Sequence, residues 1–464
     1  MKNTIWVAAA QAGSGLLRIV LIVYAMRMIG VSEWGIFSYA LGITGVLALF
    51  SDIGMTSFVM REMSKSADNS NQYFATAFFV KIGIYIIGTI GILGGAQFLS
   101  LATPVFRLLP FLLVVMILDG LHDLTNVLAR SSEKMQIEAL VNTGAALMQM
   151  IVGFILLSIS PSSEMLAAAY VIGSGSGLLA LILIFKKYFG NILHLARLSL
   201  VKPLVKQSWP LCLAVFTGTI MINTDIIIIG ALLTSHDVGI YSAAYRFVQI
   251  ATMVLGLIVV PLIPVMARFA DDTARFTNLM KKSIQGSLLI SIPIMAGGLA
   301  SAPTIISFLY GDAYLPATPI LRILIMTVLV SFPSIIMSTG LYAQKKERYL
   351  TIYSIIGIFT NLFLNLILIS SFGVVGISYS TLVVQIILFL FLLSVSPNIG
   401  MMDIGKGLWK ISAASVIMVF YIVIAQRIGL VDLAVLGGAT LTFGVAIVLL
   451  KERYLQEIKS AFAS

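Results

Sequence analysis

Long apolar runs separated by short polar connections make up most of the chain. A helix needs about 20 apolar residues to cross the hydrocarbon core of a bilayer, and most of the runs are that long. Apolar and polar residues do not alternate within them, which excludes the strands of a membrane barrel. The pattern predicts an all-α polytopic membrane protein with about 14 transmembrane helices. The predicted spans are 4–28, 36–60, 73–98, 105–130, 137–159, 164–186, 205–233, 239–266, 283–309, 317–343, 350–370, 375–395, 411–427 and 432–450.

A short motif occurs twice at the same place in this pattern. Residues 35–40 read Gly-Ile-Phe-Ser-Tyr-Ala and residues 239–244 read Gly-Ile-Tyr-Ser-Ala-Ala, each after a polar turn between two long apolar runs. The copies lie about 204 residues apart, a spacing typical of transporters built from two related halves. An even number of spans separates them, so both halves enter the membrane in the same direction. We therefore expect two six-helix lobes related by a pseudo-twofold axis along the membrane normal.

The lobes are delimited by polar links. The N-lobe is predicted at 1–187 (spans 1–6), a basic cytoplasmic linker at 188–204 and the C-lobe at 205–395 (spans 7–12). Residues 396–464, with spans 13 and 14 and the tail, form a C-terminal helix pair outside the internal symmetry.

Composition supports a bilayer as the solvent. Of the 464 residues 59% are hydrophobic and 10% charged, whereas soluble proteins are about 25% charged. With Cys212 as the one cysteine, no intrachain disulfide or cysteine metal site can form, and we expect no metal centre. The apolar start of the chain is interpreted as an uncleaved first span, because it is too long for the core of a signal peptide.

The basic residues that give the chain its net charge of +10 are distributed as the membrane topology predicts. Lys and Arg gather in every second connection and in both tails, and only Arg27, Arg107 and Arg427 lie on the opposite side. By the positive-inside rule, both termini are expected in the cytoplasm. Because topology accounts for the basic residues, no nucleic-acid partner is expected.

The connections are too short to hold a catalytic domain. The sequence also contains no Walker A loop, no Gly-x-Gly-x-x-Gly after a strand and no His-Glu-x-x-His. These observations argue against an enzyme and against nucleotide-driven transport within this chain.

Polar residues recur at helical spacing inside several spans, and charge is costly in hydrocarbon unless it meets a partner or water. Stripes of this kind occur in the fourth, first and eleventh spans, and lone charges occur in others. The stripes are Asp119, His122, Asp123, Asn126 and Arg130; Gln11, Ser14, Gly15 and Arg18; and Ser354, Gly357, Asn361 and Asn365; the lone charges are Asp52, Lys81, Asp225, Arg246 and Arg322.

Two interpretations of these groups stay open. They can form interhelical ion pairs that hold a lobe together, or they can line a hydrated cavity between the lobes. In the second case the basic and amide groups would bind an anionic substrate, and the acidic groups and histidine would hold those cations or a coupling proton or Na⁺. His122 is either a proton relay or a hydrogen-bonded partner. The substrate candidates are Arg18, Lys81, Arg246, Arg322, Gln11, Asn361 and Asn365, and the ion or partner candidates are Asp52, Asp119, His122, Asp123 and Asp225.

Several short segments are similar to one known family. Met28-Ile-Gly-Val-Ser-Glu-Trp-Gly-Ile-Phe-Ser38, Ser51-Asp-Ile-Gly-Met55 and Met60-Arg-Glu62 resemble the opening of polysaccharide-transport flippases. These belong to the multidrug/oligosaccharidyl-lipid/polysaccharide exporter superfamily. Further segments match in the second half: Tyr310-Gly-Asp-Ala-Tyr-Leu-Pro-Ala317, Asn361-Leu-Phe-Leu-Asn365 and Phe372-Gly-Val-Val-Gly376.

The resemblance implies a function and a location. It implies an alternating-access transporter that moves a polyprenyl-pyrophosphate-linked oligosaccharide to the outer leaflet of a bacterial-type inner membrane. The exported sugar would be used to build surface polysaccharides such as lipopolysaccharide. The implied partners are membrane lipids and the polysaccharide polymerase machinery. Alternatives are a cation-coupled multidrug exporter or a lipid II flippase of the same superfamily. A sugar polymerase or ligase, or a membrane scaffold, fits less well, since the outer loops are minimal and a scaffold leaves the polar stripes unexplained.

Overall fold

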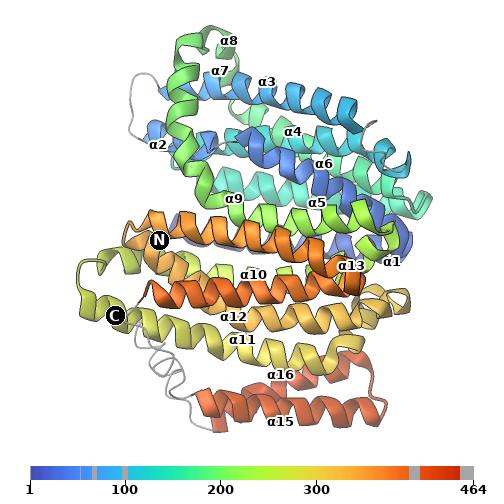
Figure 1. Ribbon diagram of the computed structural model, residues 1–464. Coiled ribbons are helices and arrows are strands. Elements are labelled where there is room, and N and C mark those ends of the chain that lie inside the picture. Colours follow the sequence, from blue (N-terminus) through green and yellow to red (C-terminus); the bar gives the residue numbers. More distant parts are fainter. Residues whose placement is uncertain (1, 53, 65–69, 97–102, 397–407, 450–464) are drawn as a thin grey trace. The chain divides into compact units, whose positions relative to one another are not determined.

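The structure is a computed structural model that describes residues 2–52, 54–64, 70–96, 103–396 and 408–449 (Figure 1). These residues form long helices with short connections. The helices are α1 (Lys2–Asp52), α2 (Met55–Ser64), α3 (Ser70–Ala96), α4 (Thr103–Ser131), α5 (Met135–Ile159), α6 (Ser163–Ile184), α7 (Lys186–Phe189), α8 (Ile192–Leu195), η1 (Leu198–Leu200), α9 (Val201–Leu232), α10 (Ser235–Arg268), α11 (Thr273–Tyr310), η2 (Asp312–Ala317), α12 (Thr318–Ala343), α13 (Glu347–Ser394), α15 (Leu408–Arg427) and α16 (Asp432–Leu449).

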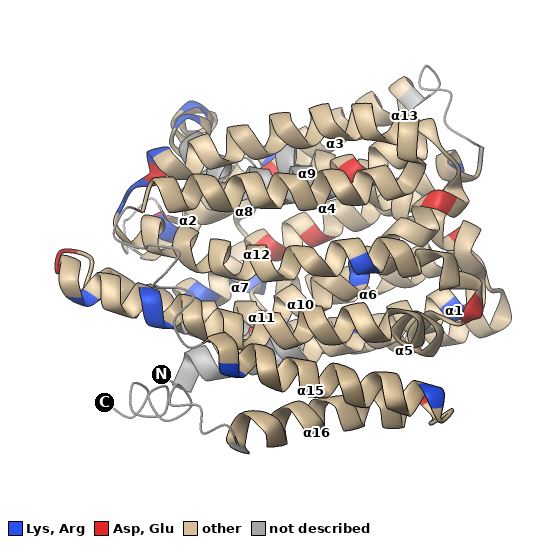
Figure 2. Cartoon of the chain, turned by 60° about the horizontal axis from the view of Figure 1, so that its bottom comes forward, with Lys and Arg blue, Asp and Glu red and all other residues tan. Residues whose placement is uncertain are grey.

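Each predicted span corresponds to a helix or to half of one, except the second, 36–60, which runs from the second half of α1 into α2. Counting only the residues that the structure describes, nine helices are long and apolar enough to cross a membrane. Two of them are longer than one span: α1 covers the first predicted span and most of the second, and α13 covers the eleventh and nearly all of the twelfth. Most of each helix consists of residues other than Lys, Arg, Asp and Glu (Figure 2). The predicted fold class, an all-α polytopic membrane protein, is confirmed.

Single glycines break the two longest helices. α1 bends at Gly30, where φ is 77°, and α13 bends at Gly373, where φ is 57°. Both angles lie in the region that side chains with a Cβ rarely adopt, which is why glycine occupies these turns. The breaks fall between predicted spans 1 and 2 and between spans 11 and 12, so each long helix is a pair of spans joined by a tight turn.

The chain divides into two compact units, Met1–Gly239 and Ile240–Ser464. In the first unit α1 packs against α4, α5 and α9, and α6 packs against α4 and α5. α9 therefore belongs by packing to the first unit, although the repeat assigns it to the second lobe. The lobe boundaries, which follow the repeat, stay a prediction.

The second unit is a series of neighbouring helices. α12 packs against α11 and α13, and α15 packs against α11 and α16. Met418 and Ile422 of α15 and Val435 of α16 form a small core that includes Ala296 and Ala300 of α11. The last two helices are thus attached to this unit through one face of α11.

The first glycine of each copy of the repeated motif lies in a close backbone contact within the first unit. A Cβ on Gly35 would lie 1.7 Å from the carbonyl oxygen of Ser235, and a Cβ on Gly239 would lie 2.1 Å from that of Val31. Positions 31 and 35 correspond to 235 and 239 in the repeat, so the contact is reciprocal. Only glycine allows the backbones to approach this closely.

Gly35→Ala is expected to destabilise the protein by about 1–3 kcal/mol, because the added methyl group forces two backbones apart. Gly144→Ala is the matched control: it lies in α5 with no atom near the new Cβ, and alanine favours a helix by up to about 1 kcal/mol. The melting temperature of the detergent-purified protein measures both. A Gly35→Ala variant that melts at or above the parent temperature would contradict the close contact.

Candidate functional site

A polar pocket opens among the apolar helices of the first unit. Its volume is about 560 Å³, and its walls come from α1, α2, α3, α4 and α9. Leu41, Leu112, Val115 and Met116 form apolar parts of the wall. The polar lining consists of Thr44, Asp52, Thr56, Ser57, Lys81, Tyr85, Asp119, Asp123, Arg130 and Asn223.

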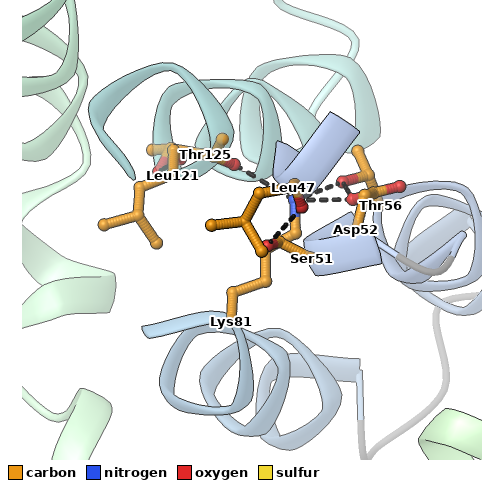
Figure 3. A network of polar contacts seen from close by, with 8 residues as sticks. Leu47, Ser51, Asp52, Thr56, Lys81, Leu121 and Thr125 are labelled. Atoms are coloured by element: carbon orange, nitrogen blue, oxygen red, sulfur yellow. Dashed lines mark hydrogen bonds and ion pairs between the residues drawn. The ribbon is translucent and has the colours of Figure 1, made fainter. Parts of the chain in front are cut away.

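An ion pair lies at one side of this pocket. The Lys81 ammonium lies 2.6 Å from a carboxylate oxygen of Asp52 and donates hydrogen bonds to the Thr56 hydroxyl (3.0 Å) and the Gly120 carbonyl (3.1 Å). Thr56 in turn donates to Asp52 at 2.5 Å. Figure 3 shows the Lys81 side chain extending from its helix toward Asp52 and Thr56.

This arrangement explains how a lysine can be buried among apolar helices. The Lys81 side chain is 1% exposed, whereas Asp52 is 37% exposed. An ammonium group has three donors, and its three acceptors come from the end of α1, from α2 and from α4. An anion could bind Lys81 only by displacing one of them. Of the two interpretations of this pair, the interhelical ion pair is the one that the structure contains.

Gly120 contributes to the same corner in a second way. A Cβ at this position would lie 1.6 Å from the Tyr85 hydroxyl, so glycine leaves the space that this hydroxyl occupies. Tyr85 is almost fully buried. α3 therefore presents both its lysine and its tyrosine to the same turn of α4.

A second ion pair closes another side of the pocket. Arg130 donates from Nε to Glu138 Oε2 (2.9 Å) and from Nη2 to Oε1 (2.6 Å), a bidentate pair between α4 and α5. Glu138 is buried and Arg130 is partly exposed. Such a fork holds both side chains in a fixed orientation.

The acidic stripe of α4 divides between two environments. Asp119 and Asp123 are exposed and line the pocket. His122 is buried, its Nε2 lies 2.8 Å from Asn142 Oδ1 of α5, and its ring packs over Gly177 of α6. Since successive residues on a helix are rotated by about 100°, His122 faces the neighbouring helices while its two neighbours in the stripe face the pocket.

The other predicted residues lie elsewhere. Arg18 is exposed on α1, near enough to Asp119 to interact with it electrostatically. Gln11 lies in α1, and its side chain is outside the described residues. Asp225 of α9 is buried at 2% exposure. In the second unit, Arg246 of α10 donates to Gln249 (3.0 Å), Arg322 of α12 is exposed, and the buried Asn365 of α13 donates to Asn361 (3.2 Å).

The pocket thus joins four predicted residues, Asp52, Lys81, Asp119 and Asp123, to several that the sequence did not single out. Tyr85, Ser57 and Asn223 are among these. Their one signal in the sequence is a polar atom within an apolar run. Among the described residues, no group of three or more His, Cys, Asp or Glu is arranged to hold a metal ion.

Comparison with known proteins defines the family. Residues 1–270 match the family model described as polysaccharide biosynthesis protein, which is more than half of the chain. The chain belongs to this polysaccharide biosynthesis protein family. Residues 210–367 also match the MatE family model. The resemblance to polysaccharide-transport flippases is therefore confirmed.

Individual relatives are similar to this protein over most of its length. It is 25% identical over 385 residues to a probable low-salt glycan biosynthesis flippase of Haloferax volcanii, covering 78% of this chain and 75% of the relative. It is 20% identical to a putative O-antigen transporter of Shigella dysenteriae, covering 84% of this chain and 98% of the relative. A solved structure of the lipid II flippase MurJ in an inward closed conformation has the same fold, with a TM-score of 0.77, 18% identity and coverage of 98% and 99%.

The Asp52–Lys81 pair predicts an asymmetric response to mutation. Asp52→Ala leaves the buried ammonium without its counterion and is expected to lower stability by about 3 kcal/mol. Lys81→Met keeps the volume and leaves a carboxylate that water reaches, so it should cost less. The double variant should be more stable than Asp52→Ala alone. Melting temperatures of the three purified variants provide the test, and equal, additive losses would show that the two groups do not depend on each other.

Proposed function

We propose that this protein is an alternating-access flippase that moves a polyprenyl-pyrophosphate-linked oligosaccharide from the cytoplasmic to the outer leaflet for surface polysaccharide assembly. The observation that carries the proposal is a water-accessible polar pocket of about 560 Å³ among membrane-spanning helices, in a chain of the polysaccharide biosynthesis protein family. A lipid-linked sugar needs such a polar route for its headgroup, while its prenyl tail stays in the bilayer.

The setting follows from the same proposal. The protein would lie in a bacterial-type plasma membrane with both termini in the cytoplasm, as the distribution of Lys and Arg supports. It would transport and not catalyse, and a polysaccharide polymerase would use the exported repeat unit. Relatives named as a glycan biosynthesis flippase and an O-antigen transporter support this class of cargo.

Transport against a gradient needs a source of energy, for which we propose a coupling proton or Na⁺ bound by an acidic side chain of the spans. Asp225 is the candidate best shielded from water, at 2% exposure, whereas Asp52 is already paired with Lys81. A cation-coupled multidrug exporter would use the same residue type, so the cargo distinguishes the two functions. Stabilisation of the purified protein by lipophilic cations, without any by pyrophosphate-linked sugars, would favour the exporter.

Arg18 and Arg246 are proposed to attract the pyrophosphate, since a guanidinium forms bidentate hydrogen bonds with phosphate oxygens. Arg18→Ala and Arg246→Ala should each reduce translocation about tenfold or more, the equivalent of about 1.4 kcal/mol, and Lys at either position should restore part of it. Arg275→Ala, at a side chain that is 73% exposed, is the control and should transport normally. The assay is translocation in proteoliposomes, with membrane insertion checked by the yield of folded protein. Normal rates in both Ala variants would remove these residues from the substrate route.

A further inference from the structure

We propose that the pocket of the first unit binds the sugar end of the substrate and selects neutral or amino sugars over acidic ones. The inference rests on the proposed function, because it presumes a substrate that carries a sugar. It adds a specificity for the cargo and assigns that specificity to Asp119 and Asp123.

Both basic residues that line the pocket are engaged in ion pairs. Lys81 has its three acceptors, with Asp52 as counterion, and Arg130 is held in a bidentate pair by Glu138. Asp119 and Asp123 then supply negative charge beyond these two pairs, and both are exposed to the pocket. Arg18 interacts with Asp119 but does not line the pocket among the described residues. The pocket therefore presents a negative face to a ligand.

A negative face disfavours the pyrophosphate and suits the sugar. Like charges repel strongly at the low effective dielectric of a protein site, so a pyrophosphate or a uronic acid gains least there. An ionised carboxylate is purely a hydrogen-bond acceptor with two oxygens. Neighbouring hydroxyl groups of a sugar ring, or an ammonium group, are the donors that such an acceptor binds.

The rest of the lining fits a saccharide better than a bare ion. The hydroxyl of the exposed Ser57 and the amide of the partly exposed Asn223 add groups that can donate or accept. Leu41 and Ala48, both partly exposed, provide apolar surface for the C–H face of a sugar ring. The volume, about 560 Å³, lies in the range of about 300–1,000 Å³ typical of small-molecule sites.

The test compares four probes that differ only at the sugar. They are short-chain prenyl pyrophosphates that carry glucosamine, N-acetylglucosamine, glucuronic acid or no sugar. Each is titrated against the purified full-length protein, and Kd is measured. We expect glucosamine to bind most tightly and glucuronic acid least, with a spread of about tenfold or more, as one unbalanced charge contact would give.

Two variants test whether the carboxylates of Asp119 and Asp123 cause the preference among the sugars. Asp119→Asn and Asp123→Asn keep the side-chain size and remove the charge, so each should narrow the spread between the sugars to about threefold or less. Asp271→Asn is the matched control, an exposed carboxylate in the connection before α11, and should keep the full spread. If a variant fails to fold, the order of the four probes on the parent protein still decides.

The outcomes separate this inference from the function on which it rests. Equal affinities for the three sugars, or tightest binding of glucuronic acid, would overturn the sugar assignment while leaving a lipid-linked sugar as cargo. An unchanged sugar preference in both Asn variants, with an altered dependence on Na⁺, would make the pocket an ion site and would also overturn it. Failure of every probe to bind or to be translocated would instead contradict the proposed function.

Discussion

A buried ammonium group in an apolar helical bundle must satisfy all three of its donors within the protein, and the walls of the pocket follow from this requirement. Lys81 of α3 meets it with a carboxylate at the end of α1, a hydroxyl of α2 and a backbone carbonyl of α4. Leaving any of these unpaired is costly where water is excluded. One side chain thereby connects four helices around the opening, and Gly120 leaves room beside it for the Tyr85 hydroxyl.

The charges of the first unit have two different tasks. The Asp52–Lys81 and Arg130–Glu138 pairs connect helices and neutralise each other. Asp119 and Asp123 take part in neither pair and face the pocket. Charge is costly inside a membrane, and here the paired residues connect helices while the other two carboxylates face the pocket.

Sequence reasoning predicted the helices because their signal is local. Long apolar runs define the spans, and Gly30 and Gly373 mark the turns that divide α1 and α13. The repeated motif pointed to Gly35 and Gly239, which do touch. The partners of the charges were not predictable, because pairing depends on how helices pack: Lys81 and Asp52 are distant in sequence, and so are His122 and Asn142. Helical spacing placed His122 in the same stripe as Asp119, yet the stripe spans enough of the helix for its members to face different neighbours.

The proposed function requires that the protein moves a pyrophosphate-linked sugar across a bilayer. The most direct measurement uses proteoliposomes that contain the purified protein and a short-chain prenyl-pyrophosphoryl-N-acetylglucosamine with a fluorescent label on the sugar, quenched from outside by a membrane-impermeant reagent. The proposed function predicts that the labelled sugar lipid of the inner leaflet becomes quenchable faster than it does in protein-free vesicles. A phosphatidylethanolamine labelled on its headgroup, in the same vesicles, should stay protected. Equal quenching rates with and without protein, or equal movement of both lipids, would contradict it.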